Sequence, residues 1–360
     1  MMDGLPDELL LNIFYRLPVK ALGSCILVKK PWLYLIKSPS FISSYNINDG
    51  QNNEYFIFCN GNYDLELHAD NEGFDLHRVF TRWEQRNTRV LIPASCCNGT
   101  MCVTDNKKGV PIVLWNPAIR KTLTLPKPNL VVAKCNHLLG FAYDSIEDDY
   151  KVLRMLIDVH SLPQVEIFSL NRNSWKTISE FAPNFNYREP VQPCFNGALH
   201  WIGYYGSNHK AVILGFDVNK EEFRVLPLPE ALEENKLKPT LLVFEKSSLA
   251  LCRYFESPQF HIEIWVMKEY GDVESWSKLW NYGFHELGYG DVLGFRNDGK
   301  LLCTVFNRDQ VVVSVDLETG ESEVLLEEAP YTSFDGLKYR ETLFLLDNAQ
   351  AQSYIPHAQA

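Results

Sequence analysis

Apolar and polar residues alternate over most of the chain, in short runs that end at Gly, Asn, Asp or Pro. Alternation with a period of two predicts β-strands. After residue 90 the pattern repeats, because five similar strand–turn–strand segments begin 53, 47, 50 and 50 residues apart. These segments begin at Ile112, Val165, Val212, Ile262 and Val312.

Each of these segments is preceded by another predicted hairpin. The preceding hairpins lie within residues 95–102, 140–156, 194–201, 241–252 and 294–306. Asn98-Gly99, Asn196-Gly197 and Asp298-Gly299 supply the positive φ angles that tight hairpin turns need. Two hairpins make a four-stranded unit, and four-stranded units of about 50 residues are typical of β-propeller blades.

The two ends of the chain each supply half a repeat. Residues 333–347 predict a first hairpin without a second, and residues 54–68 predict a second hairpin without a first. Joined, they would form a sixth blade and remove open sheet edges. We therefore predict a mainly β protein: a six-bladed β-propeller closed by strands from both chain ends, preceded by a small three-helix module. An irregular β-sandwich is the alternative.

The first 45 residues have a helical pattern instead. Apolar residues recur at spacings of three and four between Leu9 and Leu17, which predicts a helix over residues 5–16. Pro18 ends it, and further helices are expected at 19–28 and 29–36. Three short helices bury too little surface to be stable alone. Their apolar excess is expected to pack on the β domain as a cap, or to bind a partner.

An ordered set of residues in this segment resembles the F-box over about 40 residues. The set comprises Leu5-Pro6-Asp7-Glu8-Leu9, Ile13, Arg16 through Leu22, Val28, Lys30, Trp32, Leu35-Ile36, Pro39 and Phe41. The resemblance implies binding to a Skp-type adaptor and, through it, to a cullin scaffold. It carries adaptor binding to Leu5, Pro6, Leu9, Ile13, Leu17, Pro18, Val19, Leu22, Val28 and Trp32.

Two positions depart from the F-box pattern. Ser24-Cys25 stands where plant members usually carry Arg-Phe, and Pro31 stands where a small polar residue is common. A degenerate F-box on a non-ligase interaction scaffold is therefore an open alternative.

The repeats after residue 90 resemble the F-box-associated, kelch-type domain of plant F-box proteins, an architecture shared by S-locus F-box proteins. The resemblance covers about 250 residues and rests on blocks such as Leu114-Trp-Asn-Pro, Asp149-Tyr-Lys-Val, Ala198-Leu-His-Trp and Ile262-Glu-Ile-Trp-Val-Met-Lys-Glu-Tyr-Gly. It implies the substrate-recognition subunit of an SCF-type E3 ubiquitin ligase, whose propeller binds an unknown target protein for ubiquitination and degradation. The expected domains are 1–45, the F-box; 46–350, the propeller; and 351–360, a C-terminal tail.

Long connections should bind the target. Strand direction alternates within a blade, so connections 1–2 and 3–4 emerge on one face and connections 2–3 and 4–1 on the other. The second set is long: 69–88, 127–138, 157–164, 180–193, 228–239, 255–261 and 281–291. Long loops on a rigid scaffold often carry function, and Tyr, Trp and Arg are usual interface anchors. The candidates are Trp83, Arg86, Phe185, Tyr187, Arg188, Tyr204, Tyr205, Phe255, Phe260, Tyr282, His285 and Tyr289, unless they fold back onto the blades.

Charge and cysteine content narrow the partners and the compartment. The net charge is −11, and no basic run, Lys29-Lys30 and Lys107-Lys108 included, is longer than two residues, so nucleic acid and anionic membranes are not expected partners. The nine cysteines are an odd number and sit mostly in apolar runs, and no signal peptide is visible. These features favour a reducing compartment, the cytoplasm or the nucleus. No apolar stretch approaches the roughly 18 residues of a membrane span.

Enzyme signatures are absent from the sequence. There is no His-Glu-x-x-His and no Gly-x-Ser-x-Gly, and the nine histidines are scattered. Cys96 and Cys97 should point to opposite sides of a strand, and with Cys102 they are interpreted as core residues. We expect a non-catalytic protein without metal or cofactor. A propeller hydrolase or oxidase with a helical cap is the alternative.

Overall fold

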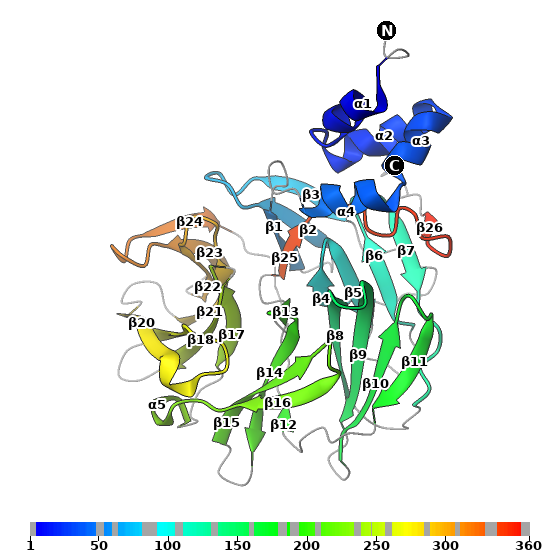
Figure 1. The fold of residues 1–360 in the computed structure, drawn as a ribbon. Coiled ribbons are helices and arrows are strands. Elements are labelled where there is room, and N and C mark those ends of the chain that lie inside the picture. Colours follow the sequence, from blue (N-terminus) through cyan, green and yellow to red (C-terminus); the bar gives the residue numbers. More distant parts are fainter. Residues whose placement is uncertain are drawn as a thin grey trace.

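Six antiparallel sheets follow one another around a ring, with four helices at one side (Figure 1). This computed structural model describes residues 5–47, 54–59, 64–80, 92–104, 111–130, 136–157, 162–178, 186–187, 194–205, 210–233, 239–245, 247–255, 261–283, 289–306, 310–327 and 337–353. The mainly β, six-bladed propeller predicted from the repeat is confirmed.

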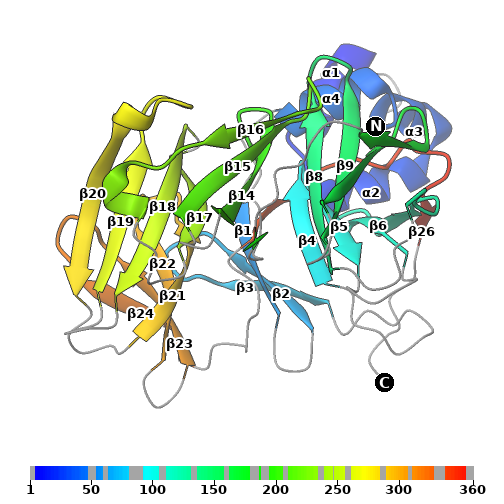
Figure 2. The same cartoon turned by 90° about the horizontal axis from the view of Figure 1, so that it is seen from below.

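The N-terminal helices are α1 (Asp7–Phe14), α2 (Val19–Val28), α3 (Lys30–Ile36) and α4 (Pro39–Ile47). The first three correspond to the three predicted helices, and Pro31 lies in the first turn of α3, where its missing N–H costs nothing. The fourth helix was not predicted. Figure 2, turned by 90°, again shows the helices gathered at one side of the ring.

The first three blades pair their strands in chain order, except where strands from the C-terminal end join them. Blade 1 contains β25 (Leu337–Arg340), β1 (Glu54–Cys59), β2 (Leu65–Ala69) and β3 (Leu76–Phe80). Blade 2 contains β4 (Ile92–Cys97), β5 (Thr100–Thr104), β6 (Val113–Asn116) and β7 (Lys121–Thr124), with β26 (Gln352–Ser353) on its outer edge. Blade 3 contains β8 (Asn136–Asp144), β9 (Asp149–Ile157), β10 (Gln164–Ser169) and β11 (Ser174–Ile178).

The other three blades repeat this order. Blade 4 contains β12 (Asn186–Tyr187) and β13 (Cys194–Phe195), which both pair with β14 (Ala198–Tyr205), then β15 (Lys210–Asp217) and β16 (Glu222–Leu226). Blade 5 contains β17 (Thr240–Phe244), β18 (Ser248–Phe255), β19 (His261–Met267) and β20 (Trp276–Gly283). Blade 6 contains β21 (Tyr289–Phe295), β22 (Leu301–Phe306), β23 (Gln310–Val315) and β24 (Ser322–Leu326). Two short helical segments, α5 (Glu230–Glu233) and η1 (Val273–Ser275), lie between strands.

The hydrophobic core is divided into layers between neighbouring blades. Each of the six seams has its own buried cluster, and a seventh cluster lies in the helices. Between blades 6 and 1, for example, Phe56 and Phe58 pack with Leu293 and Val312. A blade therefore buries both of its faces, which explains why every residue of central strands such as β5 and β6 is buried rather than every second one.

Each seam also has a polar contact that joins the two blades. In order around the ring, these contacts are Asn116–Thr342, Asn98–Tyr150, Lys151–Glu221, His200–Tyr270, Tyr254–Val292 and Arg296–Asp70. Asn116, Tyr150, His200 and Tyr270 belong to the sequence blocks that carry the family resemblance. The described part of the chain thus gives these block residues a role in holding blades together.

The prediction for blade 1 was wrong by one strand. The hairpin 54–68 forms strands 2 and 3 of the blade rather than 3 and 4, because β1 pairs with both β2 and β25. Strand 4 is β3, which lies within a segment predicted as a loop, 69–88. Residues 333–347 do not supply a hairpin in their described part, since only 337–340 form a strand there.

Gly99 lies where the turn after β4 meets the segment that follows β25. Asn98 and Gly99 both have positive φ, as predicted for this turn, and so do Asn196 and Gly197 in blade 4. A Cβ at Gly99 would lie 2.2 Å from the carbonyl oxygen of Arg340 and 2.6 Å from Thr342 Oγ1. The backbone of the two segments could not stay so close with any other residue at this position.

Gly99→Ala should therefore destabilise the protein by more than the ordinary cost of placing alanine in the left-handed backbone conformation. That ordinary cost is about 1–2 kcal/mol. Gly197→Ala is a matched control, because φ is +69° there against +68° at Gly99, and its nearest neighbour is a side-chain amide at 3.3 Å. Urea denaturation should give a larger loss of unfolding free energy for Gly99→Ala. Equal losses would mean that the contact with Arg340 is not tight in solution.

Candidate interaction surfaces

The four helices share one hydrophobic core with a segment of the propeller. Phe14, Leu22 and Trp32 form its centre, and Leu343 and Leu346, which follow β25, are buried among them. Phe14 and Trp32 meet edge to face, with ring centroids 5.4 Å apart. The helices therefore do not form a separate domain joined only by a linker, because part of their core comes from the other end of the chain.

Helix α4 makes the polar part of this joint. Asn46 accepts a hydrogen bond from the backbone N–H of Leu343 at 3.0 Å, and its carbonyl accepts one from Arg340. Tyr45 donates to the carbonyl of Leu17 at 2.7 Å, and burial raises the pKa of its hydroxyl to about 12, so it stays protonated. These contacts tie α4 to the propeller and to the connection between α1 and α2.

The helices also expose large apolar side chains. The exposed fractions are 50% for Leu9 in α1, 84% for Leu27 and 65% for Val28 at the end of α2, and 71% for Tyr34 in α3. Pro6, Pro18 and Pro31 are exposed as well. The same helices that pack on the propeller therefore leave several large apolar side chains exposed to solvent.

The ten predicted adaptor-binding residues divide by exposure. Pro6, Leu9, Pro18 and Val28 are exposed; Leu5, Ile13 and Leu17 are half-buried; and Val19, Leu22 and Trp32 are buried. The three buried residues hold the helices together and are not available for contact in this structure. Leu27 and Tyr34 are exposed but were not predicted, and their only sequence signal is that they lie outside the buried stripe of their helices.

The helices and the strand ends that the long connections join lie on opposite faces of the propeller. The helical core includes Ala118 and Ile119 from the turn between β6 and β7, a 3–4 connection. Because the strands are antiparallel, connections 2–3 and 4–1 emerge at the other ends of the blades. One change follows from the shift in blade 1: residues 70–75 are a 3–4 turn on the helical face rather than part of a long loop.

The predicted target-binding residues are placed unevenly. Trp83, Arg86, Phe185, Arg188, Phe260 and His285 lie outside the described residues. Tyr187, Tyr205, Tyr282 and Tyr289 belong to strands β12, β14, β20 and β21 rather than to loops.

The side chains of Tyr204 and Phe255 are described. The expectation of an exposed loop residue was wrong for Tyr204, which is buried in the layer between blades 4 and 5. Phe255 is half-buried at the end of β18, where it stacks on His261 with ring centroids 4.4 Å apart. It is therefore the one described candidate that keeps an exposed aromatic surface at this face.

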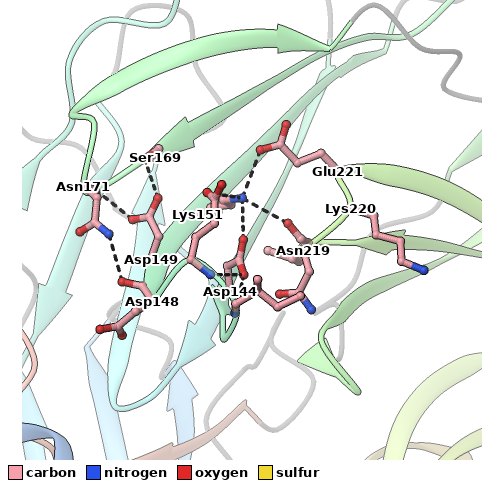
Figure 3. A network of polar contacts seen from close by, with 12 residues as sticks. Asp144, Asp148, Asp149, Lys151, Ser169, Asn171, Asn219, Lys220 and Glu221 are labelled. Atoms are coloured by element: carbon pink, nitrogen blue, oxygen red, sulfur yellow. Dashed lines mark hydrogen bonds and ion pairs between the residues drawn. The ribbon is translucent and has the colours of Figure 1, made fainter.

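A buried lysine joins blades 3 and 4 on the helical face (Figure 3). The side chain of Lys151 is 3% exposed, and its Nζ lies 2.7 Å from Asp144 Oδ2, 3.2 Å from Glu147 Oε2 and 3.1 Å from Glu221 Oε1. Burial disfavours the charged form of Asp144, but hydrogen bonds from Lys151 and from two backbone N–H groups outweigh it and hold the pKa of Asp144 below its usual value. The pKa of Glu221 is low for the same reasons, with hydrogen bonds from Lys176 and Lys151 overcoming burial.

Among the described residues, no cluster of three or more His, Cys, Asp or Glu residues could hold a metal ion. Cys102 is buried, as interpreted from the sequence, whereas Cys96 and Cys97 are half-buried. None of the described helices is long and apolar enough to cross a membrane.

Comparison with known proteins covers both the helices and the propeller. Residues 52–356 match the family model of the F-box associated beta propeller domain. From Arabidopsis thaliana, F-box protein CPR1 is 27% identical over 90% of this chain and 84% of its own length. F-box/LRR-repeat/kelch-repeat protein At2g27520 is 27% identical over 94% and 91%, and F-box/kelch-repeat protein At3g23880 is 26% identical over 77% and 79%.

Solved structures show only a distant likeness. TolB from Acinetobacter baumannii superposes with a TM-score of 0.49 and 11% identity, over 84% of this chain and 70% of that one. At this level the likeness carries no information on function. The family match, by contrast, spans the propeller, and the relatives extend over the helices as well. The chain belongs to the family of plant F-box proteins that carry an F-box-associated β-propeller domain.

Proposed function

We propose that this protein is the substrate-recognition subunit of an SCF-type E3 ubiquitin ligase. Its helices α1–α3 bind a Skp-type adaptor, which connects to a cullin scaffold, and its propeller binds a target protein for ubiquitination and degradation. The protein itself is non-catalytic: it raises the effective concentration of target lysines near the charged enzyme.

The observation that carries this proposal is the set of large apolar side chains that the helices expose. Leu9, Leu27, Val28 and Tyr34 come from three consecutive helices and face solvent. Exposed apolar residues that cluster in a small module are typical of protein-binding sites. Leu343 and Leu346 are buried in the core of the module, whereas these four side chains are exposed and therefore accessible to an adaptor.

The arrangement of the two faces supports separate sites for the adaptor and for the target. We take residues 1–45 as the adaptor-binding module and 46–350 as the target-binding propeller, with 351–360 as a tail that begins at the outer edge of blade 2. The pairing of β1 with β25 would close the ring by joining both ends of the chain. A closed propeller holds a target on the long-loop face one blade height away from the adaptor, about 15–20 Å for strands of this length.

The proposal predicts that Leu27→Asp/Val28→Asp abolishes adaptor binding. A charge that must be buried in an apolar contact costs several kcal/mol, so affinity should fall by at least about a hundredfold. Ile146→Asp is the matched control, because Ile146 is 77% exposed but lies on the propeller. Binding of the purified full-length protein to a recombinant Skp-type adaptor can be measured by calorimetry. Retained binding in the double variant would remove the adaptor role from these helices.

Capture from plant extract with the proteasome blocked tests the target-binding half. We expect a protein that is retained by wild-type and by Leu27→Asp/Val28→Asp, and lost in Trp83→Ala/Arg86→Ala/Phe255→Ala. If the loop variant captures the same protein, the long-loop face is not the target site. The degenerate F-box scaffold would instead show target capture without adaptor binding even in the wild-type chain. A hydrolase or oxidase would instead turn over a substrate and would bind neither the adaptor nor a target protein.

A further inference from the structure

One short segment near the C-terminal end packs into both parts of the protein. It comprises residues 341–346 and follows β25 directly. Leu343 and Leu346 are 0% and 5% exposed and belong to the core of the helices. Leu345 is 1% exposed and belongs to the core between blades 2 and 3. The 341–346 segment therefore divides its leucines between two different cores.

The backbone of this segment bends at Leu345. Its φ angle is +72°, in the left-handed region that leucine rarely adopts. Such a conformation persists only where the surrounding structure holds it. The Leu346 N–H donates to the carbonyl of Leu343 at 3.0 Å, which closes a turn, and Asn116 donates to the carbonyl of Phe344 at 2.8 Å. The bend lets neighbouring leucines enter the helical core and the blade core.

Polar contacts hold the segment on each side. On the side of the helices, the Leu343 N–H donates to Asn46 Oδ1 at 3.0 Å. On the side of the propeller, Thr342 Oγ1 donates to the carbonyl of Asn98 at 2.8 Å, and Asn116 donates to the carbonyl of Thr342 at 3.0 Å. Thr342 is 2% exposed and Asn116 is 0% exposed. The helices and the propeller therefore cannot separate here without breaking buried contacts.

The helices depend on this segment for part of their core. Short helices bury little apolar surface by themselves. Leu343 lies 297 residues after Asn46, in a segment that begins where β25 stops pairing with β1. Removing a buried leucine side chain leaves a cavity, and the resulting loss is large compared with the stability of so small a module. The arrangement of α1–α3 is therefore complete only when the far end of the chain has folded.

We propose that the 341–346 segment completes the adaptor-binding module, so that the helices bind the adaptor only in a chain whose C-terminal end has folded onto blades 1 and 2. A chain with an unfolded or missing C-terminal end would then not enter a ligase complex. Adaptor binding and docking of the segment stabilise each other, because such linkage is reciprocal. The adaptor part of this inference rests on the proposed function, whereas the dependence of the helices on the segment does not.

Hydrogen exchange of the full-length protein, read by mass spectrometry, tests this dependence. In Leu343→Ala/Leu346→Ala, the amides of α1–α3 should exchange at least about tenfold faster than in wild-type, because cavities open in their core. Leu345→Ala is the matched control, since it removes an equally buried leucine of the same segment from the blade core. It should accelerate exchange in blades 2 and 3 and leave α1–α3 at the wild-type rate. Equal exchange of the helices in the two variants would overturn the proposal.

A milder variant keeps the test decisive if the double variant does not fold. Asn46→Ala removes only the side-chain hydrogen bond to the Leu343 N–H. Exchange of α1–α3 should rise by about two- to tenfold, the range that a single hydrogen bond contributes. Ser44→Ala, at an exposed position of the same helix, should leave the rate unchanged. The same rate in both of these variants would contradict the role of the segment.

The reciprocal effect is measured with a recombinant Skp-type adaptor. At an adaptor concentration of about 100 Kd, the amides of Leu343 and Leu346 should exchange more slowly, by up to about a hundredfold. The affinity for the adaptor should be at least about tenfold lower in Leu343→Ala/Leu346→Ala than in Leu345→Ala.

Two outcomes would refute this linkage: adaptor binding without slower exchange in the segment, or equal affinity of the two variants. An adaptor that does not bind the wild-type chain would refute the proposed ligase role instead. The exchange rates of the helices would still decide whether the segment completes the module.

Discussion

Replacing Asp70 by alanine should cost about 3–5 kcal/mol of unfolding free energy, the usual effect of removing one partner of a buried ion pair. Asp70 is 2% exposed and Arg296 is 4% exposed, and they meet at 3.2 Å across the seam between blades 6 and 1. Asp70 also accepts a hydrogen bond from the backbone N–H of Asn297 at 2.8 Å. Without Asp70, the guanidinium of Arg296 stays buried with Ser314, a carbonyl and the ring of Phe74 as partners, none of which is an anion. Urea denaturation measures the loss.

A nearby carboxylate provides the control. Asp298 lies in the same turn as Arg296 and pairs with Lys300 at 3.8 Å, but its side chain is 46% exposed. Asp298→Ala should cost less than about 1 kcal/mol, because exposed ion pairs contribute little. Arg296→Met in the Asp70→Ala background should recover part of the loss by removing the unpaired charge. Equal costs for Asp70→Ala and Asp298→Ala would show that this pair does not stabilise the seam.

The period of about 50 residues was enough to predict the number of blades, because each blade repeats the same burial on both faces. The turns at Asn98-Gly99 and Asn196-Gly197 were predictable for a local reason, since their positive φ angles restrict the residue types. The outer strand of blade 1 could not be predicted in this way. Leu76 and Val79 of β3 are exposed, so the strand has no buried stripe to distinguish it from a loop.

The contacts that join blades could not be predicted from the sequence. Asn116 donates to the carbonyls of Thr342 and Phe344, and Thr342 is 226 residues further along the chain. Nothing near Asn116 in the sequence indicates this partner. The same holds for Lys151 and Glu221, which are 70 residues apart. The sequence blocks therefore indicate the family, but the sequence alone does not show that they join neighbouring blades.

The candidate sites show the same limit. A helical pattern identifies an apolar stripe on α1, but it does not show which apolar residues remain exposed once Leu343 and Leu346 pack among the helices. That is why Leu22 and Trp32 were grouped with Leu9 and Val28 in the predicted adaptor site. Aromatic residues near loops were ambiguous for a similar reason, because Tyr204 extends a strand whose neighbours in blade 5 bury it.

Replacing Lys151 by methionine should also cost about 3–5 kcal/mol near neutral pH, because Asp144 would stay fully buried without its cation. Figure 3 shows the network and a natural control within it, Lys220, which points away from the carboxylates. Lys220→Met should change the unfolding free energy by less than about 0.5 kcal/mol. Urea denaturation of both variants at pH 7 checks the difference. A small effect in both would mean that Lys151 is not the link between blades 3 and 4.

The Lys151 prediction has a pH dependence with a defined sign. Asp144 and Glu221 have folded-state pKa values below their unfolded values, which are about 3.9 and 4.3. Their contribution to stability is therefore present above about pH 4 and is lost as the pH falls through the folded values. The pKa of Lys151 is raised, because its three carboxylate partners outweigh burial, so its contribution is lost only above about pH 10. The gap between wild-type and Lys151→Met should be constant from pH 5 to 9 and should narrow below pH 4. A gap that widens in acid would contradict the ion pairs as its source.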